Sequence, residues 1–330
     1  MLVNVLLFIV GLGMLIKGGD WFVDSASGIA RRFRLPELLI GATVVSIGTT
    51  LPEVMVSAQG AMAGSGGMAY GNAIGSIICN TSLIAAITVA IKPGRVERSA
   101  LIMPVSFFFV AATLYMAVAY LTGQFSRMIG IVLLALFLTY MIATFLQMKK
   151  TPAAELDGYV EEEPPAQEIT EKKGSLVKEI LLLVIGAALI AFGANLLVDN
   201  GTAIAEKLGV PDTVIALTFV ALGTSLPELV TAITSLIKGH GALSLGNIIG
   251  ANLFNLVLVG GVSTVISPFP VPSESTIGGM PASLVLDLPV MLGVMLILIL
   301  PTLICGKLSR AQGIGLLCVY VTFCTLQFVM

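Results

Sequence analysis

Charged residues are scarce in this sequence, and their scarcity decides the class of protein. Asp, Glu, Lys and Arg make up 11% of the 330 residues, against about 25% in a typical soluble domain. Apolar residues make up 57%, and the mean hydropathy is +1.02. Apolar runs of about 20 residues recur along the chain, and each is long enough to cross roughly 30 Å of hydrocarbon. This composition excludes a soluble globular domain and predicts an all-α polytopic membrane protein.

Cysteine and histidine are also few. The four cysteines lie in apolar runs without C-x-x-C spacing, so they indicate no disulfide framework. The single histidine, His240, falls in a predicted loop. Residues 1–16 lack a basic n-region and a small-residue cleavage site, so we expect them to begin the first membrane span rather than a signal peptide. No cofactor signature is present, and we expect no cofactor.

The apolar runs predict ten membrane spans in two groups of five. Their expected bounds are 2–24, 36–62, 69–91, 99–121, 126–148, 177–200, 211–237, 243–267, 283–304 and 309–329. Residues 149–176 are rich in Asp, Glu and Pro, which indicates a solvated acidic linker between the groups. The expected domains are therefore a first five-helix repeat at 1–148, this linker, and a second five-helix repeat at 177–330.

Lysine and arginine are distributed unequally between the two sides of the predicted membrane. Loops after odd-numbered spans hold 14 of them, whereas loops after even-numbered spans hold two. By the positive-inside rule, both termini are expected outside the cell and the acidic linker in the cytoplasm, with the protein in the plasma or inner membrane. A miscounted span would mix the two sets of loops, so this asymmetry also supports the count of ten.

Two phrases occur twice, each time at an offset of 175 residues. GTTLPE ends at Glu53 and GTSLPE ends at Glu228, while GNAIGSIICN at 71–80 matches GNIIGANLFN at 246–255. Residues 36–80 and 211–255 are identical at 16 of 45 aligned positions. Because five is odd, the second group of spans enters the membrane in the opposite sense to the first. The sequence therefore predicts an inverted repeat, an arrangement typical of secondary transporters.

The repeated glutamates are the leading candidates for a functional site. A carboxylate at bilayer depth costs a few kcal/mol, so a glutamate in mid-span indicates function by default. Thr49 and Thr50 precede Glu53 by four and three residues and should share its helix face. Pro52 has no N–H to donate, so we expect the second helix, and the seventh by analogy, to be broken at this motif. The alternative is a purely structural role as a helix cap at the membrane edge. The occurrence of the motif in both halves argues against it.

The second repeated phrase places polar residues on one helix face in each half. These residues are Asn72, Ser76 and Asn80 in the first half and Asn247 and Asn255 in the second, with Ala251 at the place of Ser76. Glycines four residues apart in the same phrase predict close helix approach. All the donor atoms are hard oxygens, which suit Ca²⁺ and Na⁺ rather than Zn²⁺ or copper. Hydrogen bonding between helices is the alternative role for each asparagine.

With these four phrases, the sequence resembles the α-repeats of the cation/calcium exchanger superfamily, in its sodium/calcium exchanger branch. The resemblance covers essentially the whole chain and implies Na⁺-driven Ca²⁺ antiport by alternating access, with helices 1 and 6 sliding as gates. The partners it implies are Ca²⁺ and Na⁺ ions and the lipid bilayer, without nucleic acid or an obligate protein partner. The metal-binding residues it implies are Glu53, Glu228, Thr49, Thr50, Thr224, Ser225, Ser76, Asn80 and Asn255, with backbone carbonyls of Ser46 and Ala221.

The sequence departs from this family in two places. Some relatives have Ser at the place of Ala251, and some, notably in the potassium-dependent branch, have Asp at the place of Asn255. A GNAAEH-like phrase typical of the proton-coupled branch is absent, which favours Na⁺ as the driving ion. The main alternative is a Ca²⁺ or other divalent-cation/H⁺ antiporter on the same fold. A passive cation channel and an intramembrane acid enzyme are weaker alternatives, and we expect no enzymatic activity.

Overall fold

The structure is a computed structural model that describes residues 2–33, 35–96, 98–150, 159–160, 175–208, 223–273 and 276–329. Nearly all of the described chain is helical. Eight of its helices or helix series are long and apolar enough to cross a membrane, and a shorter apolar helix runs from Leu226 to Ile237. Apolar side chains such as Leu2, Leu121 and Ile304 are largely exposed, as expected for helices that face lipid.

The first half contains five helical spans. They are α1 (Leu2–Phe33); α2 (Glu37–Ile40), η1 (Gly41–Val45) and α3 (Ser46–Met62) in series; α4 (Gly66–Cys79), η2 (Asn80–Ala85) and α5 (Ala86–Ile91) in series; α6 (Arg98–Thr122); and α7 (Arg127–Lys150). The segments labelled η are turns of π-helix within otherwise α-helical spans.

The second half repeats this order after the acidic segment. Its spans are α8 (Leu176–Lys207); α11 (Leu226–Ile237); α12 (Gly241–Phe254), η5 (Asn255–Val259) and α13 (Gly260–Ile266) in series; η6 (Ser283–Asp287) and α14 (Leu288–Cys305) in series; and α15 (Arg310–Val329). The expected first part of the seventh span lies in residues 209–222, outside the described residues. The order agrees with ten spans in two five-helix repeats.

Two expected helix bounds are wrong. α1 continues to Phe33 instead of ending near residue 24, and α8 continues to Lys207 instead of ending near residue 200. The end of α1 remains helical because it still buries Ser25, Ala26 and Ala30 in its last turns, and packing of this kind outweighs the low local hydropathy.

The second span also differs in detail from a broken helix. Its series of helices has no gap from Glu37 to Met62, and Pro52 lies inside α3. The irregularity is the π-helical turn η1, which precedes Pro52. Two buried hydroxyls bond to carbonyls of this turn: Ser46 Oγ lies 2.7 Å from the Gly41 carbonyl, and the Tyr140 hydroxyl donates to the Ala42 carbonyl at 2.9 Å. These contacts satisfy backbone groups that the wider turn would otherwise leave unpaired.

In the described residues, three short antiparallel strand pairs join the loops. β1 (Arg95–Val96) pairs with β3 (Tyr159–Val160), β2 (Gln124–Phe125) with β4 (Phe269–Pro270), and β5 (Thr276–Ile277) with β6 (Met280–Pro281). The β2–β4 pair connects the α6–α7 loop to the segment after α13, and Phe125 stacks against Phe269 at a ring-centroid distance of 5.2 Å. The two halves are therefore linked at the loops as well as in the core.

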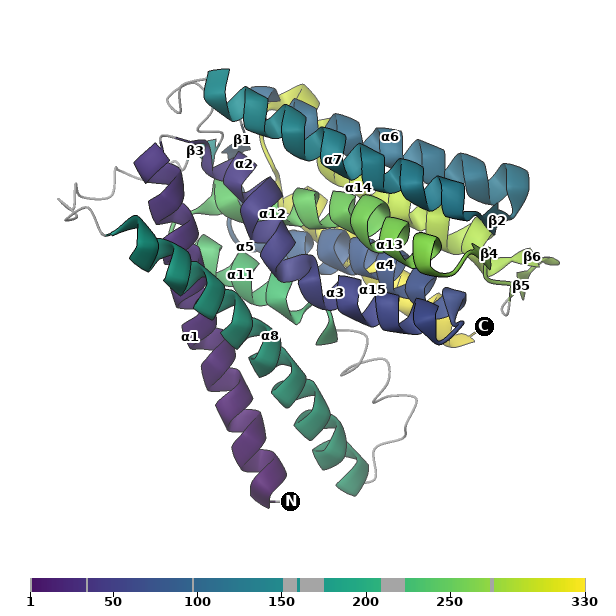
Figure 1. Ribbon diagram of the computed structural model, residues 1–330, viewed down its shortest axis with the longest axis horizontal. Coiled ribbons are helices and arrows are strands. Elements are labelled where there is room, and N and C mark those ends of the chain that lie inside the picture. Colours follow the sequence, from purple (N-terminus) through teal and green to yellow (C-terminus); the bar gives the residue numbers. More distant parts are fainter. Residues whose placement is uncertain are drawn as a thin grey trace.

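α1 and α8 form a pair that lies beside the main bundle and crosses it at an angle (Figure 1). Glycines allow this close packing, because a Cβ on Gly18 would meet the Gly186 carbonyl oxygen at 2.9 Å and one on Gly11 would meet that of Gly193 at 2.8 Å. These two contacts are equivalent in the repeat, because the 175-residue offset relates Gly11 to Gly186 and Gly18 to Gly193. The pseudo-twofold axis of the repeat thus passes between α1 and α8.

The remaining described helices pack around a core formed mainly by α4, α6, α12 and α14. α12 is the most enclosed of these helices, since every residue from Gly241 to Phe254 is buried. The helix series α2–η1 lies directly against α12: a Cβ on Gly246 would meet the Leu38 carbonyl, and one on Gly250 would meet Ser46 Oγ and Ala42 Cα. The predicted close approach is confirmed for the GNIIG phrase. It is wrong for Gly71 and Gly75 of the first copy, where an added Cβ would meet no atom within 4 Å among the described residues.

Candidate functional site

The two repeated glutamates lie on neighbouring helices from opposite halves. Glu53 is in α3 and Glu228 is in the first turn of α11, directly after Pro227. Both side chains are 0% exposed, and the two carboxyls are close enough for direct electrostatic interaction. Neither carboxyl oxygen pair has a hydrogen-bond partner among the described residues. Two carboxyls in such a place must be neutralised by protons or by bound cations, because a buried unpaired charge is strongly unfavourable.

The predicted hydroxyl residues of the two glutamate motifs differ in burial. Thr49, Thr50 and Ser225 are buried, whereas Thr224 is half-buried. Thr50 Oγ1 and Ser225 Oγ have no partner in the described part of the chain. Thr49 Oγ1 donates to Asn247 Oδ1 at 3.1 Å and lies near the Glu228 carboxyl. The shared face predicted for Thr49, Thr50 and Glu53 is confirmed, because all three are buried on α3.

Asn80 and Asn255 occupy equivalent positions in the two halves. Each is fully buried and each is the first residue of a π-helical turn, η2 and η5 respectively. η2 packs against α11 and η5 packs against α3, so each asparagine belongs to a turn that contacts the glutamate-bearing helix of the other half. Both side-chain amides lack hydrogen-bond partners among the described residues. π-helical turns are frequent at functional sites.

The remaining predicted positions differ in how far the structure describes them and in which groups they offer. Ser76 is buried on α4, one helical turn before Asn80. Ser46 is buried on α3, and its carbonyl lies 3.5 Å from Thr49 Oγ1. Ala221, the equivalent of Ser46 in the second half, lies outside the described residues. Ala251 is buried on α12, so its place in the second half offers no hydroxyl.

Buried polar atoms without partners are uncommon in folded proteins, and each costs about 1–3 kcal/mol. Here six of the predicted ligand residues carry such atoms: Thr50, Glu53, Asn80, Ser225, Glu228 and Asn255. All are oxygen donors or amides from the two repeated motifs. Among the described residues no group of three or more His, Cys, Asp or Glu could hold a metal. A cation here would therefore use two carboxylates together with neutral oxygens, a donor set suited to Ca²⁺ or Na⁺.

α1 and α8 cover this group of residues. A narrow gap between the helices is lined by Phe22 of α1, by Ala187, Ile190 and Ala191 of α8, and by Gly48, Thr49, Pro52 and Pro227 of the two glutamate motifs. The Phe22 ring lies against Gly48, where an added Cβ would be 3.0 Å from the ring. Movement of the α1–α8 pair along the bundle would therefore change access to the buried carboxyls.

The model of the family described as sodium/calcium exchanger protein matches residues 3–146 and 178–329. The chain belongs to the sodium/calcium exchanger family. The exchanger is 33% identical to the sodium/calcium exchanger MaX1 of Methanosarcina acetivorans and 34% identical to the putative antiporter CaxA of Alkalimonas amylolytica, with 99% of both chains covered in each case. Its structure matches that of the sodium-calcium exchanger NCX_Mj soaked with 10 mM Na⁺ and zero Ca²⁺, with a TM-score of 0.78, 32% identity and 97% of each chain covered. The exchanger is thus a multi-pass membrane protein with the ten-helix inverted-repeat fold, and it belongs to a family of transporters rather than to an enzyme family.

Sequence reasoning missed the specific contacts of two asparagines in the exchanger. Asn247 accepts the Thr49 hydroxyl and so connects α12 to the glutamate motif of the first half. Asn72 donates to Ser57 Oγ at 2.7 Å and to the Glu53 carbonyl at 3.2 Å. The polar stripe on each helix predicted that these residues face a partner. It could not predict which partner, because that depends on the packing of distant segments.

Proposed function

We propose that this exchanger carries Ca²⁺ in one direction across the membrane and Na⁺ in the other, by alternating access to a single site between its two halves. The observation that supports this most directly is the pair of fully buried carboxyls, Glu53 and Glu228. They lie in motifs whose buried oxygen and amide groups have no hydrogen-bond partner in the described part of the chain. Two negative charges can be neutralised by one Ca²⁺ or by Na⁺ ions. Competition between these cations for the same carboxylates is the basis of exchange.

The proposed ligands are the two carboxylates together with neutral groups from both motifs. The neutral groups are the hydroxyls of Thr49, Thr50, Ser76, Thr224 and Ser225, the amides of Asn80 and Asn255, and the carbonyls of Ser46 and Ala221. Hydroxyl, amide and carbonyl oxygens complete the coordination that Ca²⁺ prefers, which is six to eight oxygens. The second half has Ala251 at the place of Ser76 and so lacks one hydroxyl. The two halves would therefore offer cations different numbers of ligands.

The charge of the site couples ion binding to movement. With both carboxylates neutralised by cations, the site can be enclosed by the α1–α8 pair at low electrostatic cost. A site that retains net negative charge opposes the same movement, because a dehydrated charge is unfavourable. In this scheme the protein lies in the plasma or inner membrane with both termini outside, and the acidic linker faces the cytoplasm.

The test is Ca²⁺ uptake into membrane vesicles loaded with Na⁺ and diluted into Na⁺-free medium. We expect uptake by the wild type, and loss of uptake in both Glu53→Gln and Glu228→Gln. Glu206→Gln is the matched control, since it removes a carboxylate from an exposed position on α8 and should leave uptake intact. Full uptake by both site variants would refute the proposal.

The same vesicles distinguish the proton-coupled alternative. We expect Ca²⁺ uptake to follow an imposed Na⁺ gradient and to be insensitive to a pH gradient of either sign. Uptake that follows the pH gradient and ignores Na⁺ would identify a Ca²⁺/H⁺ antiporter instead. Ca²⁺ flux that does not require a counter-ion would identify a channel.

A further inference from the structure

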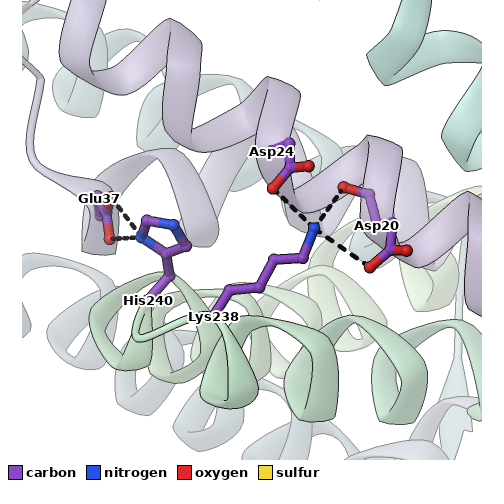
Figure 2. A network of polar contacts seen from close by, with 5 residues as sticks. All are labelled: Asp20, Asp24, Glu37, Lys238 and His240. Atoms are coloured by element: carbon purple, nitrogen blue, oxygen red, sulfur yellow. Dashed lines mark hydrogen bonds and ion pairs between the residues drawn. The ribbon is translucent and has the colours of Figure 1, made fainter. Parts of the chain in front are cut away.

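A charged contact outside the cation site connects α1 to the bundle. Figure 2 shows Lys238, the residue that follows α11, between two aspartates of α1. Lys238 Nζ lies 2.8 Å from Asp24 Oδ1, 3.2 Å from Asp20 Oδ1 and 3.3 Å from the Asp20 carbonyl. The side chains of Lys238, Asp20 and Asp24 are 24%, 38% and 61% exposed, so solvent screens much of the contact without removing it.

The surroundings show that Lys238 is held as a cation. Burial alone would lower the pKa of Lys238, but the hydrogen bonds and charges of Asp24 and Asp20 outweigh it and raise the pKa above the ordinary lysine value. Its position after the last turn of α11 is also favourable, since the negative end of a helix dipole attracts cations. The ammonium therefore has its partners on α1 and its anchor on α11.

The backbone of α1 packs tightly against side chains of α11 beside this contact. A Cβ on Gly19 would lie 2.8 Å from Val230 Cγ1 and 2.9 Å from Thr234 Oγ1, one turn before Lys238. An open groove of about 240 Å³ follows the same line of contact, lined by Ile16, Asp20, Val230, Ile233, Thr234, Ile237 and Lys238. α1 therefore meets α11 at a small glycine surface with a charged clamp at its end.

A neighbouring contact between charged side chains joins different elements. His240 Nδ1 lies 2.9 Å from Glu37 Oε1, which joins the α11–α12 loop to α2 (Figure 2). Both of these elements pack within the bundle that carries the cation site. The His240–Glu37 contact includes no residue of α1, whereas the distances from Lys238 to Asp20 and Asp24 depend directly on the position of α1.

The inverted repeat does not reproduce the lysine clamp at the other end of the molecule. The 175-residue offset places Asn195 and Asp199 of α8 at the positions of Asp20 and Asp24, but Ala63 at the position of Lys238. Asp24 thus has an equivalent carboxylate in Asp199, whereas Lys238 has no equivalent basic residue. A contact that the repeat does not duplicate favours one of two otherwise similar conformations.

We propose that Lys238 is a positioning residue for transport, which fastens α1 to the bundle at the end of the molecule predicted to be cytoplasmic and so favours the conformation closed at that end. Asp20 and Asp24 are four residues apart, a rise of about 6 Å along the helix. One ammonium can contact both carboxylates in a single register of α1 against α11. Sliding of α1 from this register breaks at least one of the contacts. This inference rests on the proposed exchange function for its transport measurements.

The clamp predicts opposite effects on the two faces of the membrane. Apparent affinity scales with the fraction of protein that is open to the side where the ion is added. Removal of the clamp in Lys238→Ala should strengthen apparent Ca²⁺ affinity on the Lys238 face and weaken it on the other. The expected change is about two- to fivefold on each face, the range set by a partly exposed ion pair. A general folding defect would lower the rate without opposing shifts.

The experiment measures Ca²⁺ exchange in proteoliposomes sorted by orientation, with an epitope at the C terminus to report the sidedness. Lys238→Ala should show the opposing shifts, and Lys238→Arg should restore wild-type affinities on both faces. Glu37→Gln is the matched control, because it removes the neighbouring ion pair without touching α1. Shifts in the same direction on both faces, or none, would overturn the assignment of Lys238.

A second measurement keeps the clamp separate from the proposed function. Hydrogen–deuterium exchange of the purified protein should show faster exchange around residues 19–33 of α1 in Lys238→Ala than in the wild type, and no such change in Glu37→Gln. Equal hydrogen–deuterium exchange of α1 in Lys238→Ala and wild type would refute the proposed clamp, even if Ca²⁺ transport is confirmed. If the wild type fails to carry Ca²⁺ with a Na⁺ gradient, the exchange proposal fails, and this measurement alone decides the clamp.

Discussion

The glycine contacts between α1 and α8 predict a difference between two glycine-to-alanine substitutions on the same helix. In Gly18→Ala the new Cβ would lie 2.9 Å from the Gly186 carbonyl oxygen and 3.0 Å from the Ile190 backbone nitrogen. These are backbone atoms of α8, so they can move only if the whole helix moves. In Gly13→Ala the new Cβ would have no neighbour within 4 Å among the described residues.

The expected magnitude follows from two opposing effects. Alanine is favoured over glycine within a helix by about 0.5–1 kcal/mol, and both variants share this gain. Overpacking at a tight contact costs about 1–3 kcal/mol, and only Gly18→Ala incurs it. The unfolding free energy of Gly18→Ala should therefore be lower than that of Gly13→Ala by about 1–3 kcal/mol, because the shared helix gain cancels in the comparison.

Chemical unfolding in detergent micelles, followed by circular dichroism, measures this difference. Gly186→Ala should behave like Gly18→Ala, since it adds a methyl group to the same contact from the other helix. In the double variant the two losses should not add, because the first methyl already separates the helices. Equal stability of Gly13→Ala and Gly18→Ala would refute the close packing of α1 on α8.

Three further predictions test other contacts. Asn247→Ala removes the acceptor of the Thr49 hydroxyl and should weaken apparent Ca²⁺ affinity by about 2- to 10-fold, the equivalent of one net hydrogen bond; unchanged affinity in vesicle uptake would contradict this role. Tyr140→Phe leaves the Ala42 carbonyl of the π-helical turn unpaired and should lower the unfolding free energy by about 1–3 kcal/mol in chemical unfolding; an unchanged unfolding free energy would contradict this. The effect of the Lys238 clamp on apparent Ca²⁺ affinity should be independent of pH from about pH 6 to 9. Because the pKa of Lys238 is raised, the clamp contributes fully below the ordinary lysine pKa of about 10.4 and is lost only as the pH rises through the raised pKa. If the difference in apparent Ca²⁺ affinity between wild type and Lys238→Ala disappeared within this pH range, the assignment would be contradicted.

Much of the architecture could be predicted from the sequence because it follows from hydropathy and duplication. The apolar runs marked the spans, and the two copies of the glutamate phrase indicated which parts of them face a common interior. Burial of Glu53 and Glu228 followed from the same pattern, since a carboxylate in mid-span cannot face lipid. These features depend on local composition, which the sequence contains directly.

The contacts that were not predicted depend on the packing of distant segments. Thr49 and Asn247 are 198 residues apart, and their pairing requires the register of α3 against α12. The lysine clamp requires the position of α1 beside α11, which hydropathy does not report. The length of α1 was underestimated for a related reason: its charged last turns are stabilised by neighbours rather than by lipid.

The π-helical turns at Asn80 and Asn255 have a consequence for the relation between the two halves. A wider turn inside an α-helix rotates the residues beyond it relative to the residues before it. Both turns begin at the same place in the two halves. Each half therefore presents its asparagine in an equivalent way, and the symmetry of the repeat extends to this irregularity of the helix.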